Sequence, residues 1–386
     1  MKIMNTRRIT EKIYQSMQLR EISSMVNGIL TNNIAANSII PTDLEMLMQE
    51  ATRVQKKMTN YSVDRVMLLL IVGSLIGPYL EQEPEAMDFF MNWIAAESKV
   101  FDVKDFYKNP YIQNIDFTYQ ENGDYELRNH EKKPYELDIY NIPKYIDELY
   151  IDIPRIGCFS EEFIYPAIFQ KSRKETWMSV SPNEVFTMKQ PIKNAKGRVL
   201  TLGCGMGYFA YMASLKENVE SVTIIELEQS VIELFEKCLL PQFKNKEKIK
   251  IIKADAVEYL RNMEDGEFDY CFADIWIGVL DIVPYFAVKE IGRNFRKTKM
   301  EYWIEESFAT LLTTQVWIEI MTAFSEANNI DVSPIDEGLM TDAERREKEY
   351  IHNLLKDVNI TKPEHIDYYM NPKNIIYLIN NTDIIF

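Results

Sequence analysis

Short apolar runs alternate with helix-like segments between Gly197 and about Phe295. Each run is rich in Val, Ile, Leu or Phe and short enough for a buried parallel strand, and a further run follows just beyond. The five runs are residues 199–202, 221–225, 249–252, 268–272 and 299–304. Strands that alternate with helices in this way predict an α/β fold, with a Rossmann-like, doubly wound parallel sheet.

The first hundred residues predict helices instead. Residues 42–45 (Thr-Asp-Leu-Glu) have the form of a capping box and open an amphipathic segment that ends near Met58. The longest apolar stretch, residues 66–78, is shorter than the ~20 residues of a membrane-spanning helix and is interrupted by Gly and Pro, so we expect a buried helix. Residues 84–98 predict another helix. These apolar stripes indicate a core, a dimer face or a lid.

A small β-rich module is expected between this helical region and the Rossmann-like domain. The pair Asn122–Gly123 stands between strand-forming residues, which is a strong hairpin signal. Residues 135–140 and 148–153 continue the strand pattern.

The pattern weakens towards the end of the chain. A helix is expected from Glu305 to about Phe324, a loop over residues 328–342, a helix over 343–356 and a final strand at 375–379. The chain is therefore divided into four parts. They are a helical N-terminal region (1–101), a β-rich module (102–175), a Rossmann-like domain (176–325) and a C-terminal extension (326–386).

Composition narrows the classes of partner. Among 386 residues the formal net charge is −16, and no basic stripe stands out, which argues against a nucleic acid and favours a small-molecule substrate. Four scattered Cys and three His have no metal-ligand spacing, so no metal is expected. The N-terminus lacks the apolar run of a secretory signal, and we expect a cytoplasmic protein with no membrane contact. The apolar N-terminal helices make a homodimer plausible.

The chemistry is concentrated where the predicted strands end. The first strand runs into a Gly-x-Gly-x-Gly loop, residues 203–207, and glycines allow such a loop to turn with positive φ and to approach a ligand closely. Dinucleotide sites place the third glycine one residue later, where this chain has Tyr208. Acidic residues follow the next three strands, at Glu226, Asp255 and Asp274.

In this loop and these acids, the segment from Thr176 to Ile291 resembles the class I S-adenosylmethionine-dependent methyltransferases and the related, spermidine-synthase-like aminopropyltransferases. The resemblance implies S-adenosylmethionine as cofactor. It also implies that the glycine loop lies under the methionine part of that cofactor. The loop residues concerned are Gly203, Cys204, Gly205 and Gly207. No sequence neighbour of Cys204 is placed to lower the pKa of its thiol, so a nucleophile is not expected there.

The same resemblance assigns cofactor contacts to the acidic residues that follow the strands. Glu226, with Leu227 beside it, corresponds to the residue that accepts from the two ribose hydroxyls, although Glu228 remains an alternative. Asp255, with Ala256 beside it, corresponds to the residue that accepts from the adenine amino group. Asp274 falls near the reacting centre.

Methyl transfer to a small molecule is the function that we expect first, with an amine among the candidate acceptors. Asp274 can hold a cationic amine and Trp276 can pack against it, so these two are the catalytic candidates. Residues 177–184 precede the first strand of the domain and can form a lid over the cofactor.

Two alternatives stay open. In aminopropyltransferases the corresponding Asp is followed by small hydroxyl residues and a second acid, whereas Asp274 is followed by Ile-Trp-Ile-Gly. This difference removes the expected pair of carboxylates and ranks aminopropyl transfer below methyl transfer. The third possibility is a non-catalytic protein that binds the cofactor or a partner.

Overall fold

A five-stranded sheet in which all strands are parallel forms the centre of the α/β part of the protein. The computed structural model describes residues 1–36, 43–330 and 340–386. The strand order is β11-β10-β9-β12-β13. The strands are β9 (Gly197–Leu202), β10 (Val219–Glu226), β11 (Ile249–Lys253), β12 (Tyr270–Ala273) and β13 (Lys299–Tyr302). The order reverses between β9 and β12, where a parallel sheet leaves a crevice at its carboxyl edge. The predicted fold class is confirmed.

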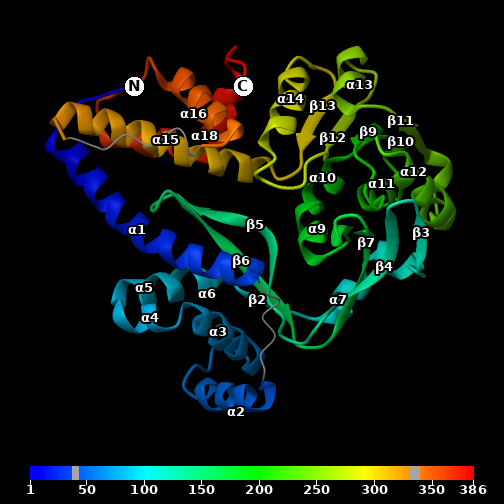
Figure 1. Cartoon of the computed structure of the whole chain (residues 1–386), viewed down its shortest axis with the longest axis horizontal. Helices are drawn as coiled ribbons and strands as arrows, with labels where there is room; N and C mark the ends of the chain where they lie inside the picture. Colours follow the sequence, from blue (N-terminus) through cyan, green and yellow to red (C-terminus); the bar gives the residue numbers. More distant parts are fainter. Residues whose placement is uncertain (37–42, 331–339) are drawn as a thin grey trace.

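Helices pack around this sheet, drawn in green to yellow in Figure 1. The segments are α9 (Pro182–Thr187), α10 (Lys189–Asn194), α11 (Tyr208–Ser214), α12 (Gln229–Leu234), η2 (Phe235–Leu239), η3 (Leu240–Gln242), η4 (Lys246–Lys248), α13 (Ala256–Asn262) and α14 (Ile282–Gly292). The central strand β9 is inaccessible to solvent at Val199, Leu200 and Leu202, which is why it appears as an unbroken apolar run in the sequence.

Two small sheets and two short helices precede the Rossmann-like part. One sheet has the order β2-β6-β5 and the other the order β3-β4-β7-β8. The elements are β2 (Lys99–Phe101), α7 (Val103–Tyr107), α8 (Pro110–Asn114), β3 (Gln120–Asn122), β4 (Tyr125–Lys132), β5 (Asp138–Ile146), β6 (Ile151–Phe159), β7 (Phe163–Gln170) and β8 (Glu175–Ser179). The predicted hairpin is confirmed: Asn122 pairs with Tyr125 across a turn in which Gly123 has a φ of +58°.

The N-terminal region is helical, as predicted. Its elements are α1 (Arg7–Ala36), α2 (Leu44–Gln55), α3 (Val63–Ile76), α4 (Pro78–Gln82), α5 (Pro84–Phe89), η1 (Phe90–Ile94) and α6 (Ala95–Glu97). Asp43 caps α2 by accepting from the Met46 backbone N–H, while Thr42 of the expected capping box lies outside the described residues. Helix α3 is buried as expected, in one core with α1, α5, β5 and β6. Within the described residues, no helix is both long and apolar enough to span a membrane.

In the described residues that follow the Rossmann-like part, 305–330 and 340–386, there are four helices. They are α15 (Glu305–Asn328), α16 (Asp342–Leu355), α17 (Pro363–Tyr369) and α18 (Pro372–Asn380). The strands β1 (Lys2–Ile3) and β14 (Asn359–Ile360) pair in parallel, so the N-terminus lies beside the C-terminal helices (Figure 1). The helix predicted at 343–356 is confirmed, and most of the predicted loop, residues 331–339, lies outside the described residues.

The strand predicted at residues 375–379 is wrong, because this segment belongs to α18. Asn371 caps the helix by accepting from the Lys373 backbone N–H, and Pro372 is its first residue. Ile375 and Ile379, four residues apart, are both buried, which places them on one face of a helix.

Candidate active site

The glycine loop is held in contact with two strands at the switch point of the sheet. Gly203 has a φ of +94°, and its N–H donates to the Ile225 carbonyl oxygen at 2.8 Å. A Cβ at this position would overlap the carbonyl oxygen of Asp274. Only glycine therefore lets the ends of β9, β10 and β12 come together here.

The rest of the loop is equally crowded. A Cβ on Gly205, whose φ is +48°, would overlap the Met178 Sδ, and a Cβ on Gly207 would overlap the ring of Phe235. Gly207 has a left-handed backbone and is the N-cap residue of α11, but it does not line the cavity described below. We conclude that Gly207 supports the conformation of the loop and does not itself line the cavity.

Glu226 ends β10 with its side chain fixed by the backbone. One carboxylate oxygen accepts from the Cys204 N–H at 3.0 Å and the other from the Glu228 N–H at 2.8 Å. A carboxylate offers about four lone-pair sites, so both oxygens can accept further bonds from a ligand. Leu227 is 62% exposed, and exposed Glu228 caps α12 by accepting from the Ser230 N–H at 3.3 Å.

Asp255 and Ala256 follow β11 on the same edge. The Asp255 carboxylate caps α13 by accepting from the Glu258 N–H at 2.8 Å. Asp255 is exposed and Ala256 is buried. The cap orients the Asp255 carboxylate and leaves part of its acceptor capacity for a ligand.

These residues surround one cavity of about 530 Å³. It brings together eight residues that the sequence analysis assigned to the site: Gly203, Gly205, Glu226, Leu227, Asp255, Ala256, Asp274 and Trp276. Trp177 and Met178 of β8 also line it, so part of the predicted lid segment does face the site. Cys204 lies instead in a smaller adjoining cavity of about 30 Å³.

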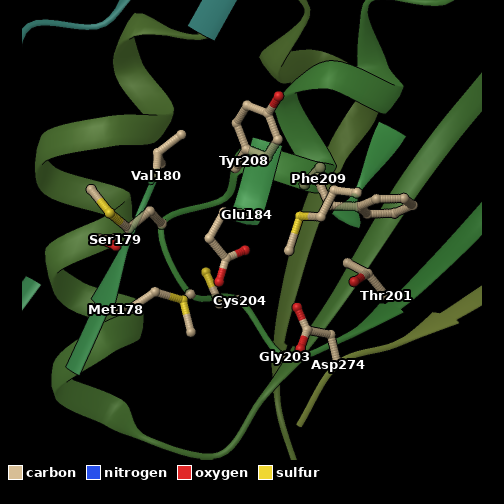
Figure 2. Close-up of a pocket in the computed structure, with 14 residues that line it drawn as sticks. Met178, Ser179, Val180, Glu184, Thr201, Gly203, Cys204, Tyr208, Phe209 and Asp274 are labelled. Atoms are coloured by element: carbon tan, nitrogen blue, oxygen red, sulfur yellow. The ribbon is translucent and has the colours of Figure 1, made fainter. Parts of the chain in front are cut away.

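Two carboxylic side chains, those of Glu184 and Asp274, line both cavities, and Figure 2 shows them in the smaller one. Asp274 follows β12, and Glu184 comes from α9, on the other side of the glycine loop. Burial raises the pKa of Asp274 to about 7. Burial, and then the negative charge of Asp274, raise the pKa of Glu184 well above its usual value. In the described parts of the chain, no group donates a hydrogen bond to either carboxyl group.

The sequence analysis included Glu184 only as the last residue of the possible lid segment, residues 177–184, and gave it no role of its own. Ser181 and Glu184 have the spacing of a capping box, and that pattern is sufficient to explain the Glu as a helix-terminal residue. The Ser181 hydroxyl does accept from the Glu184 N–H, at 3.4 Å. The Glu184 side chain, however, does not bond back to the cap and points into the cavity (Figure 2).

Trp276 and Cys204 are both buried residues. Trp276 is only 4% exposed, its Nε1–H donates to the Trp303 carbonyl oxygen at 3.2 Å, and its ring packs edge-on against Phe308. It is therefore a wall of the cavity, and its catalytic role stays a prediction. Burial raises the pKa of the Cys204 thiol, which disfavours a nucleophilic thiolate.

The site is strongly acidic. The larger cavity is lined by five acidic residues, namely Glu184, Glu226, Glu228, Asp255 and Asp274. Neither cavity has a Lys, Arg or His among its lining residues. The arrangement favours a ligand that carries positive charge and hydroxyl donors.

One protein-family model matches part of the chain. Residues 186–303 match the spermine/spermidine synthase domain. This match confirms the resemblance to class I methyltransferase-like proteins and their spermidine-synthase-like relatives. No curated protein matches the sequence significantly.

Solved structures are similar over part of the chain. Spermidine synthase from Thermotoga maritima is 16% identical, with 45% of this chain and 57% of that chain covered and a TM-score of 0.29. Spermidine synthase in complex with the transition state analogue AdoDATO is 17% identical, with 44% and 58% covered and a TM-score of 0.30. The Trypanosoma brucei PRMT1 enzyme–prozyme complex with AdoHcy is 22% identical, with 30% and 36% covered and a TM-score of 0.23. The chain thus spans less than two thirds of each of these proteins.

Proposed function

We propose that this protein, whose residues 186–303 match the spermine/spermidine synthase domain, transfers an aminopropyl group from decarboxylated S-adenosylmethionine to a small amine. One observation carries the proposal. Glu184 and Asp274 line the same cavities, and no Lys, Arg or His is among the lining residues. Such a site suits two cationic partners, the ammonium tail of the donor and the acceptor amine.

The adenosine part of the donor fits the remaining residues. A cavity of about 530 Å³ lies within the usual range for ligands of this size. In the proposed arrangement, Glu226 accepts from the ribose hydroxyls, Leu227 packs against the base, and Asp255 accepts from the adenine amino group. Gly203 and Gly205 leave room for the chain that carries the sulfonium.

The carboxyl pair serves the transfer step. A bound sulfonium donor supplies an electrophilic carbon, and its C–S bond breaks as the amine nitrogen forms the new C–N bond. Asp274 and Glu184 orient the amine towards that carbon, and the ionised member of the pair takes the proton that the nitrogen loses. A carboxyl pKa raised to about 7 makes Asp274 a stronger base than an exposed Asp, which suits this role.

Methyl transfer, the function expected first from the sequence, becomes the second candidate. Intact S-adenosylmethionine carries a carboxylate on the same tail, which would approach Glu184 and Asp274 with no basic side chain to balance it. The argument that ranked aminopropyl transfer lower was the lack of a second acid after Asp274. Glu184, from a different element, supplies a carboxylate that the local sequence does not.

Titration calorimetry with three ligands tests the proposal. We expect decarboxylated S-adenosylmethionine to bind at least about tenfold more tightly than S-adenosylmethionine or S-adenosylhomocysteine. A cationic tail favours the ionised carboxyl pair, whereas a tail carboxylate disfavours it, and a pKa change of one unit corresponds to about 1.4 kcal/mol, or about tenfold in affinity. Glu184→Gln should narrow this preference. With an amine present, mass spectrometry should detect methylthioadenosine as the second product.

The opposite preference would contradict aminopropyl transfer. Tight binding of S-adenosylmethionine with release of S-adenosylhomocysteine would establish methyl transfer instead. Binding without turnover of any tested amine would favour the non-catalytic alternative.

A further inference from the structure

The loop between β12 and α14, part of which lines the cavity, exposes large apolar side chains. Leu280 is 82% exposed and Ile277 is 76% exposed, the two highest values among the large apolar side chains of the described residues. Val283, at the start of α14, is 37% exposed. Ile277 and Val283 line the cavity itself. We call Ile277, Leu280 and Val283 the apolar rim.

The cavity wall continues this apolar character inwards. Trp276, Pro284, Ala287 and Trp303 line the cavity on the side of the β12–α14 loop. The acids other than the Glu184–Asp274 pair follow β10 and β11, on the opposite side of β9 in the strand order. The cavity therefore has an acidic side, which the proposed function assigns to the adenosine, and an apolar side that this assignment leaves unused.

The two ends of a linear diamine would need two acidic positions. The carboxyl pair accounts for the reacting nitrogen, and no other acid lines the cavity on the side of the β12–α14 loop. Asp281 of that loop does not line the cavity, and its carboxylate already accepts from the Ile277 N–H at 3.4 Å. An apolar group attached to the amine would instead cover Ile277 and Leu280, and removing such side chains from water stabilises the complex.

We infer that the acceptor is a monoamine with an apolar body, of the arylalkylamine or alkylamine class, whose nitrogen lies at Glu184 and Asp274 and whose body packs on the apolar rim. The inference rests on the proposed function, because it places the reacting nitrogen at the carboxyl pair. It assigns the choice of acceptor to the β12–α14 loop.

Competing acceptors test this inference. With decarboxylated S-adenosylmethionine as donor, we compare 2-phenylethylamine and hexylamine with 1,4-diaminobutane. We expect kcat/KM to be at least about tenfold higher for the two monoamines, the size of effect that apolar pocket contacts provide. The double variant Ile277→Ser/Leu280→Ser should raise KM for 2-phenylethylamine by about tenfold.

A matched control separates this effect from a general loss of surface apolar groups. Met46, on α2, is 61% exposed and does not line the cavity, so Met46→Ser should leave KM unchanged. Thermal unfolding of each variant checks that it is folded.

Calorimetry of donor binding distinguishes the two proposals. If the donor binds but 1,4-diaminobutane is the better acceptor, or if the rim variant keeps its KM for 2-phenylethylamine, the inference about the rim is wrong and the proposed function stands. If the donor does not bind and no amine reacts, both are wrong.

Discussion

At the scale of single residues, burial of Asp274 changes the pKa of the carboxyl group that the proposed function uses as a base. Its carboxyl group has a pKa raised to about 7, whereas in the unfolded chain it would titrate near 3.8. Between these values the folded state holds a proton that the unfolded state has lost. The contribution of Asp274 to stability is therefore most favourable below about pH 4 and declines as the pH rises to about 7.

Asp274→Asn should remove this decline, because an amide does not titrate. We expect the melting temperature of the variant, relative to the unmodified protein, to increase between about pH 5 and pH 8. Differential scanning calorimetry at several pH values measures the difference. Asp357→Asn, at an exposed position, is the control and should show no such trend. A difference that stays constant with pH would mean that Asp274 is ionised throughout.

At the scale of elements, the glycine loop sets how closely β9, β10 and β12 approach. Gly203 has a φ of +94° and faces the Asp274 backbone, which cannot move aside like a flexible side chain. Gly278, in the β12–α14 loop, has open space around the position of a Cβ and no such φ. The two glycines therefore form a matched pair.

We expect Gly203→Ala to lower the free energy of unfolding by about 1–3 kcal/mol through backbone strain and to weaken donor binding. Gly278→Ala should change the free energy of unfolding by less than about 0.5 kcal/mol. Urea unfolding monitored by circular dichroism measures both. Equal effects of the two substitutions would show that crowding at Gly203 has no energetic consequence.

At the scale of the whole molecule, buried charges join the Rossmann-like domain to the C-terminal helices. Lys289 of α14 is 4% exposed, and its Nζ lies 2.5 Å from a carboxylate oxygen of Glu305, at the start of α15. The Tyr285 hydroxyl donates to the same oxygen at 3.0 Å. Helix α15 in turn contacts β1, β5 and α18, so this pair connects distant parts of the chain.

Lys289→Met should cost about 3–5 kcal/mol, because it leaves Glu305 without the cation that compensates its burial. The control is Lys12→Met, which breaks a more exposed pair between α1 and Asp367 of α17 and should cost no more than about 1 kcal/mol. Urea unfolding again provides the comparison. Similar losses in both variants would contradict a special role for the buried pair.

Local patterns in the sequence determined a large part of the fold and one side of the site. Each of the patterns used occupies only a few consecutive residues. They are the apolar runs of the strands, the glycines at the end of one strand and the acidic residues after the next strands. Parallel strands align their carboxyl ends, so Gly203, Glu226 and Asp255 had to meet at one edge. Residues 375–379 show the limit, since a short apolar run fits a strand or a helix, and only the packing of Ile375 and Ile379 decided for the helix.

Only the tertiary structure decided which side chain accompanies Asp274. Glu184 lies on α9, before the first strand of the sheet, and its local pattern is that of an ordinary helix start. Whether such a side chain caps its helix or turns into a cavity depends on how α9 packs beside the glycine loop. That packing is a property of contacts between segments far apart in the chain, and it determines the electrostatics of the site because buried carboxyl groups act on each other through space.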